Sequence, residues 1–263
     1  LLCSSLEIEI KYKADMLHLY GSLTKYISRH NFENNCYTIG NMIQSGGFGS
    51  VYPLIKIEGS TEESKCYNLP KTLPDNLVIK KIPLSAAGLA KHIENTYREV
   101  EIIKKFVSDY IIKYYYFHYL GADMVIIMNN AGQDLVSLFE TDNPQRPTHI
   151  DTVHLIFKHT LEGLNEIHKH NYIHSDIKPS NICYNYITNI TTIVDFGLCY
   201  PNNESHLNHG TPGFLFIEAW GQNKWTFSNK LKKVVDCYAI GKTIQKILEY
   251  PSISAISDQS DKL

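Results

Sequence analysis

The segment His174-Ser175-Asp176-Ile177-Lys178-Pro179-Ser180-Asn181 decides the fold of this chain, together with Asp195-Phe196-Gly197 a short distance after it. The two segments supply a carboxylate, a cation, an amide and a second carboxylate. Transfer of a phosphoryl group needs this set, because one carboxylate orients the attacking hydroxyl and the cation neutralises phosphate charge. The amide and the second carboxylate are suited to holding magnesium. The pattern therefore predicts a phosphoryl-transfer site.

The same two segments resemble the catalytic loop and the DFG motif of eukaryotic-type protein kinases, with Ser175 where that family has arginine. The resemblance extends from about Tyr37 to about Leu248. It implies that Asp176 is the general base and that Lys178 contacts the γ-phosphate. It also implies that Asn181 and Asp195 are the magnesium ligands and that ATP is the second substrate.

The composition limits the classes of function. A formal net charge of -2 over 263 residues provides no basic field, so we expect neither nucleic acid nor a membrane surface as a partner. The six cysteines are scattered without a C-x-x-C pair, which favours reduced thiols over a zinc site or a disulfide framework. Neither a secretory signal nor a membrane-spanning stretch is visible. We therefore expect an intracellular protein of the cytoplasm or nucleus.

The order of elements predicts an α+β fold, with a β-rich first half and a helical second half. Residues 1–36 show roughly helical spacing and predict a helical extension that packs on the domain or binds a partner. Residues 53–76 are polar and contain Gly and Pro, which predicts a long irregular connection. Strands are expected at 37–51 around a glycine cluster, 77–82, 111–117, 124–128 and 192–194, and helices at 89–106, 135–139, 153–168 and 231–249.

The resemblance implies a bilobal kinase-like architecture. Residues 37–131 would form the N-lobe and hinge, and residues 132–263 the C-lobe. The family usually adds several helices after the one that carries Asp236, so we expect a shortened C-lobe. The local amino-acid sequence around the catalytic segment is similar to that of replication-origin (DDK-type), casein-kinase-like and viral kinases.

A glycine cluster in the first half resembles the kinase glycine-rich loop. Glycine lets backbone amides approach phosphates closely. Gln44 replaces the first glycine of the family pattern, and Val51 would cover the adenine. The resemblance assigns nucleotide binding to Ile43, Gln44, Ser45, Gly46, Gly47, Phe48, Gly49, Ser50 and Val51.

Lys80, in Leu77-Val78-Ile79-Lys80, resembles the lysine of V-A-I-K and would bind the α- and β-phosphates. Its implied partner is Glu99 on the following helix. The neighbouring Lys81 is expected on the opposite face of the strand, because side chains alternate.

The resemblance completes the adenine site with residues from two further segments. Met128 stands at the gatekeeper position, and Asn129 to Ala131 would form the hinge, whose backbone meets the adenine edge. Cys183 would lie beneath the adenine. We interpret it as a small buried hydrophobic side chain, not as a nucleophile.

Two residues far from the catalytic loop are expected to support it. Thr211, in a segment that resembles the end of the kinase activation segment, would hydrogen-bond near Asp176 and Lys178. Asp236 matches the motif of the helix that anchors the loop. Within the loop itself, His174 would serve as a structural brace.

The leading interpretation is an ATP- and Mg²⁺-dependent kinase that phosphorylates Ser or Thr of protein substrates, with room for an activating or regulatory partner. A pseudokinase that binds nucleotide or serves as a scaffold is the first alternative, because Gln44, Ser175 and the short C-lobe depart from the family pattern. A kinase-like phosphotransferase acting on a small molecule is the second.

Overall fold

The structure is a computed structural model of the chain. It describes residues 34–46, 49–57, 67–70, 74–83, 89–120, 123–140, 143–203, 210–215 and 229–250. The extension predicted for residues 1–36 lies outside this part except for residues 34–36, which belong to a strand. No helix within these ranges is long and apolar enough to cross a membrane.

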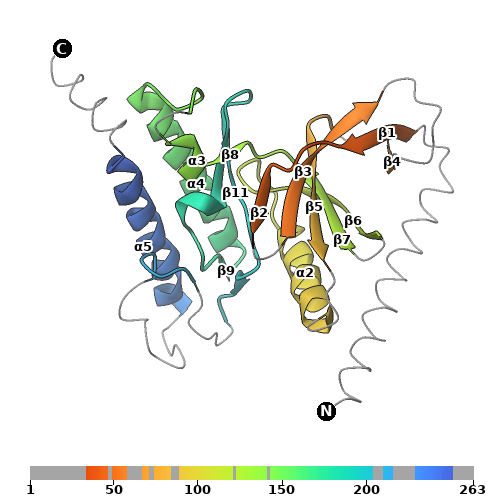
Figure 1. Cartoon of the computed structure of the whole chain (residues 1–263). Coiled ribbons are helices and arrows are strands. Elements are labelled where there is room, and N and C mark those ends of the chain that lie inside the picture. Colours follow the sequence, from red (N-terminus) through yellow and green to blue (C-terminus); the bar gives the residue numbers. More distant parts are fainter. Residues whose placement is uncertain are drawn as a thin grey trace. The chain divides into compact units, whose positions relative to one another are not determined.

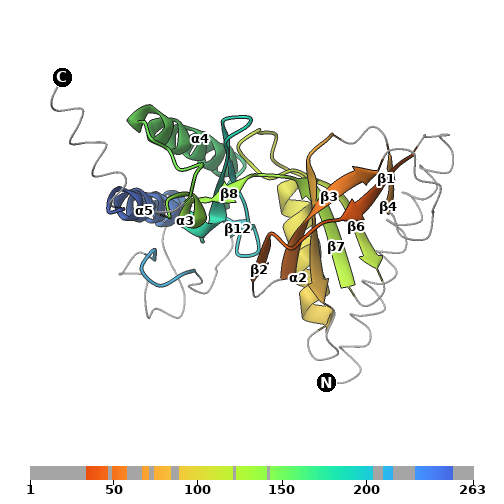
Figure 2. The ribbon, with the colours of Figure 1, turned by 45° about the horizontal axis from the view of Figure 1, so that its top comes forward.

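The chain divides into two compact units (Figure 1). The first comprises residues 1–100 and 113–130, and the second comprises residues 101–112 and 131–263. The first is built on a sheet and the second carries three of the four α-helices of the described residues (Figure 2). This distribution confirms the α+β class.

The first unit contains one antiparallel sheet of seven strands in the order β4-β1-β3-β5-β7-β6, with β2 paired to β3. Its two faces are both apolar over β5 and β7, because alternate residues on these strands point to opposite sides. The strands are β1 (Asn34–Ile39), β2 (Gln44–Gly46), β3 (Gly49–Ile57), β4 (Tyr67–Pro70), β5 (Leu77–Pro83), β6 (Tyr114–Leu120) and β7 (Asp123–Asn129). The helix α2 (Leu89–Ile103) lies between β5 and β6 in the chain.

The irregular connection predicted for residues 53–76 is wrong for residues 53–57 and 67–70, which form strands, whereas residues 74–76 are irregular as predicted. Strand β3 continues to Ile57, and β4 pairs with β1, placing Tyr67 opposite Tyr37. This pairing joins segments about thirty residues apart, so it leaves little local sequence signal. Tyr37 is buried in the core of the unit.

The second unit is mainly helical, with two small sheets. The long helix α4 (Ile150–Lys169) buries its apolar face, which includes Ile156 and Ile167, and packs against β11 (Ile190–Ile193). Its other elements are α3 (Leu135–Leu138), α5 (Asn229–Leu248), β8 (Gln133–Asp134), β9 (Tyr172–Ile173), β10 (Ile182–Asn185), β12 (Tyr200–Pro201) and the 3-10 helix η2 (Pro179–Asn181).

Most predicted elements are confirmed within a few residues. The strand predicted for 111–117 begins only at Tyr114, because Ile111 forms an isolated parallel bridge with Ile193 instead. The chain thus leaves the first unit at α2 and contributes Ile111 to the second before it returns as β6.

Candidate active site

One fully buried carboxylate holds the start of the catalytic segment, His174 to Asn181, in place. Asp236, on α5, accepts hydrogen bonds from the backbone amides of His174 (2.9 Å) and Ser175 (2.8 Å). Ser175 has a φ of 72°, a region that non-glycine residues rarely adopt. The two bonds to a charged acceptor explain how this turn is maintained. The predicted anchoring role of Asp236 agrees with this geometry.

His174 braces the loop against the second acidic segment. Its Nε2 lies 3.3 Å from the carbonyl oxygen of Val194, and its ring meets the ring of Phe196 edge-on at 4.9 Å. The side chain is fully buried. It therefore links the two quoted segments mechanically.

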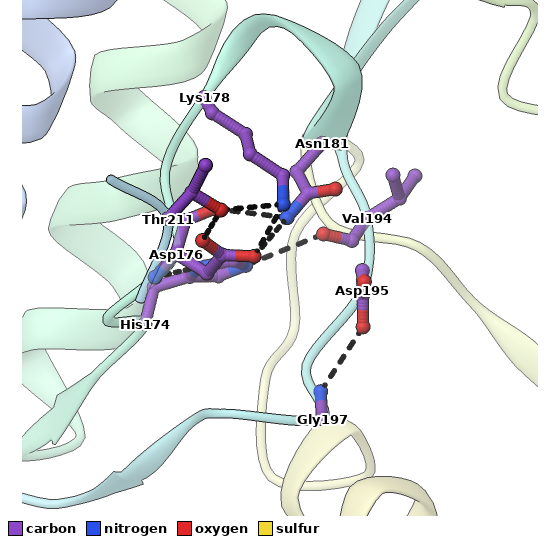
Figure 3. Close-up of polar contacts among 8 residues, drawn as sticks. All are labelled: His174, Asp176, Lys178, Asn181, Val194, Asp195, Gly197 and Thr211. Atoms are coloured by element: carbon purple, nitrogen blue, oxygen red, sulfur yellow. Dashed lines mark hydrogen bonds and ion pairs between the residues drawn. The ribbon is translucent and has the colours of Figure 1, made fainter. Parts of the chain in front are cut away.

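Asp176 is the centre of a compact polar cluster (Figure 3). One carboxylate oxygen accepts a 2.7 Å hydrogen bond from Thr211 Oγ1. The other lies 2.8 Å from Lys178 Nζ and accepts a 3.0 Å bond from Asn181 Nδ2. Lys178 also donates to Thr211 Oγ1 at 2.8 Å. The structure thus brings together four of the residues that the sequence assigned to catalysis, metal binding and loop support.

The cluster keeps Asp176 ionised. Burial raises its pKa, and this is the largest single effect. Hydrogen bonds from Lys178 and Thr211, with the positive charge of Lys178, together outweigh burial and leave the pKa below its ordinary value. A carboxylate that stays charged can accept a proton from a hydroxyl placed against it.

The two predicted metal ligands stand at the ends of paired strands. Asn181 immediately precedes β10, Asp195 follows β11 by two residues, and Val194 N donates to the carbonyl oxygen of Asn181 at 3.0 Å. The Asn181 amide nitrogen bonds to Asp176, so its oxygen points away from that carboxylate (Figure 3). Asp195 has a φ of 63°, and its Oδ1 accepts a 3.3 Å bond from Gly197 N.

These two oxygen donors suit a hard cation that takes its remaining ligands from water and phosphate, as Mg²⁺ does. Within the described ranges no group of three or more His, Cys, Asp or Glu side chains could hold a metal.

Four of the residues assigned to the nucleotide share one face of the sheet in the first unit: Gln44, Val51, Lys80 and Met128. Ser45 and Ser50 lie on the opposite face, because Ser50 pairs with Lys81 and Ser45 pairs with Ser50. Lys80 stands opposite Val51 on β3 and opposite Ile126 on β7, and Val51 in turn stands opposite Gln44. Directly paired residues point to the same side of a sheet. Met128 belongs to the same face, because its partner on β5 is two residues from Lys80.

Lys81 points to the other face, as predicted, with Nζ 5.3 Å from the centre of the Tyr52 ring.

Gly49 is required by the close approach of β5 to the glycine hairpin. Its φ is 119°, and a Cβ there would lie 2.2 Å from the carbonyl oxygen of Lys81. Ser45 and Ser50, opposite each other in the hairpin, approach to 3.1 Å between their hydroxyl oxygens, and Ile43 is exposed. Gly47 and Phe48 lie outside the described residues.

The ion pair expected between Lys80 and Glu99 is not formed. It is absent from the ion pairs of the described residues. Glu99, only 6% exposed, instead accepts a 2.6 Å hydrogen bond from the Tyr114 hydroxyl. The expectation is therefore corrected, because a half-buried tyrosine donates to the buried carboxylate that the lysine was expected to meet.

The hinge segment is held by asparagines. Asn130 donates from its backbone to Asn76 O and from its side chain to Asn76 Oδ1, both at 3.0 Å. Asn129 N donates to Lys113 O, and Lys113 N donates to Asn129 Oδ1 at 2.7 Å. Ala131, the last hinge residue, is buried at the start of the second unit.

Cys183 is buried on β10, and burial raises the pKa of its thiol to about 12, with the charge of Asp134 adding to the effect. A thiol in this state is a small hydrophobic side chain, as the sequence interpretation held.

Sequence reasoning missed two functional contacts. One is Tyr114, which holds Glu99. The other is His168, whose Nε2 lies 2.8 Å from Asp236 Oδ2. Neither lies in a motif, and both act through contacts between distant segments, so no local pattern could have indicated them.

The family model described as "Protein kinase domain" matches residues 37–262. "Probable serine/threonine-protein kinase fhkB" of Dictyostelium discoideum is 29% identical over 232 residues, covering 84% of this chain and 18% of that protein.

Two other relatives are similar over a shorter range. Serine/threonine-protein kinase cst-1 of Caenorhabditis elegans is 26% identical over 162 residues, covering 62% of this chain and 28% of that protein. Mitogen-activated protein kinase 4 of Mus musculus is 28% identical over 185 residues, covering 65% and 30%. The chain thus spans less than a third of the length of these relatives. The family match covers most of the chain and includes both His174–Asn181 and Asp195–Gly197. The chain therefore belongs to the protein kinase domain family.

Proposed function

We propose that the chain is a serine/threonine protein kinase that transfers the γ-phosphoryl group of ATP to a Ser or Thr hydroxyl of a protein, with Mg²⁺ as cofactor. The observation that carries the proposal is the ionised Asp176, held between Lys178, Thr211 and Asn181. The relatives named as serine/threonine kinases support the same acceptor chemistry.

Asp176 would accept the proton of the attacking hydroxyl as the oxygen–phosphorus bond forms. The bond between the γ-phosphorus and its bridging oxygen breaks, and ADP leaves with that oxygen. Lys178, 2.8 Å from Asp176, would neutralise charge on the transferred group. Thr211 keeps both side chains in position, since it donates to one and accepts from the other.

A magnesium ion bound with ATP would offset the negative charge of the phosphates. The side-chain oxygens of Asn181 and Asp195 would hold it. In the first unit, the Lys80 ammonium would bind phosphate on the face that Val51 also occupies.

The test is transfer of labelled phosphate from Mg·ATP to generic Ser/Thr protein substrates and to the chain itself. We expect Asp176→Asn to lower kcat by roughly 10²–10⁴, the usual contribution of a general base. We expect Asp195→Asn to abolish magnesium-dependent transfer. Asp151→Asn, which changes an exposed aspartate on the first turn of α4, is the matched control and should leave the rate unchanged.

The outcomes separate the alternatives. Nucleotide-induced thermal stabilisation without transfer would indicate a pseudokinase. ADP release stimulated by a metabolite, with no phosphate on protein, would indicate a small-molecule phosphotransferase. Transfer that survives both Asp176→Asn and Asp195→Asn would overturn the assignment of this site.

A further inference from the structure

A lysine on α5 stands over the segment that leads away from the catalytic base. Lys246 Nζ lies 5.6 Å from the centre of the Phe214 ring. Phe214 closes a turn with Thr211, since its backbone N donates to Thr211 O at 3.1 Å. Thr211 in turn bonds to Asp176 at 2.7 Å. A continuous chain of contacts therefore connects the proton acceptor to the lysine.

The surface between these points is open. Pro212 and Gly213 are exposed, and a Cβ on Gly213 would meet no atom within 4 Å. On its other side the segment lies close against the catalytic loop, because a Cβ on Gly210 would lie 2.8 Å from Ser175 O. Pro212 and Gly213 thus form an exposed edge beside the position where an acceptor hydroxyl must lie.

The charge beside this edge is positive. Among the described residues no carboxylate forms an ion pair with Lys246, which is exposed. Lys242 lies one helical turn earlier on the same side of α5, where its Nζ is 5.8 Å from the Tyr238 ring. Each of the two lysines therefore lies over an aromatic ring, Lys246 over Phe214 and Lys242 over Tyr238. Lys242 also donates a 3.1 Å hydrogen bond to Gln245 Oε1, so Lys246 is the cation that faces the edge.

We propose that Lys246 selects protein substrates with an acidic side chain close to the phosphorylated Ser or Thr. The proposal rests on the proposed kinase activity and adds a determinant of substrate choice to it. The contacts from Asp176 to Lys246 span at most roughly 20 Å, which is about six residues of extended chain. The selected position therefore lies within about six residues of the acceptor.

The test uses peptides with one central Ser in an alanine and glycine background, each carrying a single Glu or a single Lys at one position within six residues of that Ser. We expect wild-type kcat/KM to favour Glu over Lys by about tenfold at one or two positions, mainly through KM. An exposed ion pair between Lys246 and a substrate Glu contributes up to about 1 kcal/mol, and repulsion between Lys246 and a substrate Lys widens the difference. The preference should weaken in 0.5 M salt.

Lys246→Glu should reverse the preference at those positions, and Lys246→Met should remove it while keeping an unbranched side chain on the helix. Lys104→Glu is the control, because it makes the same charge change in an exposed lysine that pairs with Glu101. The control should keep the wild-type preference. A thermal melt of each variant confirms that it is folded.

Equal rates for Glu and Lys peptides in the wild type would overturn the proposal while leaving the kinase activity established. A Glu preference that persists unchanged in Lys246→Glu would do the same. Absence of transfer to every peptide and to protein substrates would instead overturn the kinase activity, and the substrate preference with it.

Discussion

The hydroxyl of Tyr114 donates a 2.6 Å hydrogen bond to Oε1 of Glu99, and this bond stands where kinase chemistry expects a bond to Lys80. Both residues belong to the first unit, Tyr114 on β6 and Glu99 on α2. A short bond to a buried carboxylate is worth about 1.5–3 kcal/mol. Tyr114 thus stabilises an arrangement in which Glu99 does not contact the lysine.

We expect Tyr114→Phe to raise kcat/KM for ATP by about three- to tenfold, because Glu99 becomes available to Lys80. The same change should lower the free energy of unfolding by about 1–3 kcal/mol through the lost bond. Steady-state kinetics and urea unfolding measure the two effects. Tyr186→Phe, an exposed tyrosine in the β10–β11 turn, should alter neither. A fall in kcat/KM like that of Glu99→Gln would show that Tyr114 positions Glu99 for catalysis instead.

The lowered pKa of Asp176 makes part of the stability depend on pH. The folded-state pKa lies below the ordinary value of 3.8 for an aspartate, so folding favours the ionised form. This contribution is complete above the unfolded pKa and is lost as pH falls through the folded pKa. The difference in melting temperature between wild type and Asp176→Asn should therefore be constant from pH 7 to pH 5 and change below about pH 4, in the direction that disfavours wild type.

Asp151→Asn, which changes an exposed aspartate outside the cluster, is measured over the same pH range as the control variant. A wild-type advantage that grew as pH fell from 5 to 3 would require a raised pKa for Asp176 and would contradict the geometry of its cluster.

The thiol of Cys183 should be inert in the folded protein. With a pKa of about 12, it holds almost no thiolate at pH 8, and it is buried. Labelling with iodoacetamide, followed by peptide mass spectrometry, should modify the exposed Cys237 well before Cys183. Addition of denaturant should bring Cys183 to the rate of an ordinary thiol. Equal labelling of both cysteines in native buffer would contradict the burial of Cys183.

The catalytic cluster could be predicted from sequence because its members are fixed by short local segments. Asp176, Lys178 and Asn181 occupy one loop and one 3-10 turn, so their spacing determines which of them meet. Thr211 joined them through a motif recognisable on its own. The face shared by Lys80 and Val51 follows from strand alternation once the two strands pair.

The remainder depends on contacts between distant segments. The pairing of β4 with β1 joins residues about thirty positions apart, and Glu99 is held by Tyr114 on another strand. An ion pair and a tyrosine hydrogen bond satisfy a buried carboxylate almost equally well, so sequence order alone does not decide between them.

Asp236 is the position where a single substitution should cost the most stability. Its carboxylate is fully buried and accepts from two backbone amides and lies 2.8 Å from His168 Nε2. An asparagine side chain has one oxygen, which can take the place of only one of the two carboxylate oxygens. Its NH2 group then faces the other backbone amide, so that two donors oppose each other without an acceptor. We expect Asp236→Asn to lower the free energy of unfolding by about 3–5 kcal/mol, which is on the order of 10 °C in Tm for a chain of this size.

Activity should fall with it, because the φ of 72° at Ser175 depends on these bonds and Ser175 adjoins Asp176. Thermal unfolding and phosphate transfer, each compared with Asp151→Asn, check the prediction. A Tm within about 2 °C of wild type would mean that the loop keeps its shape without Asp236, and that the strain at Ser175 is offset elsewhere.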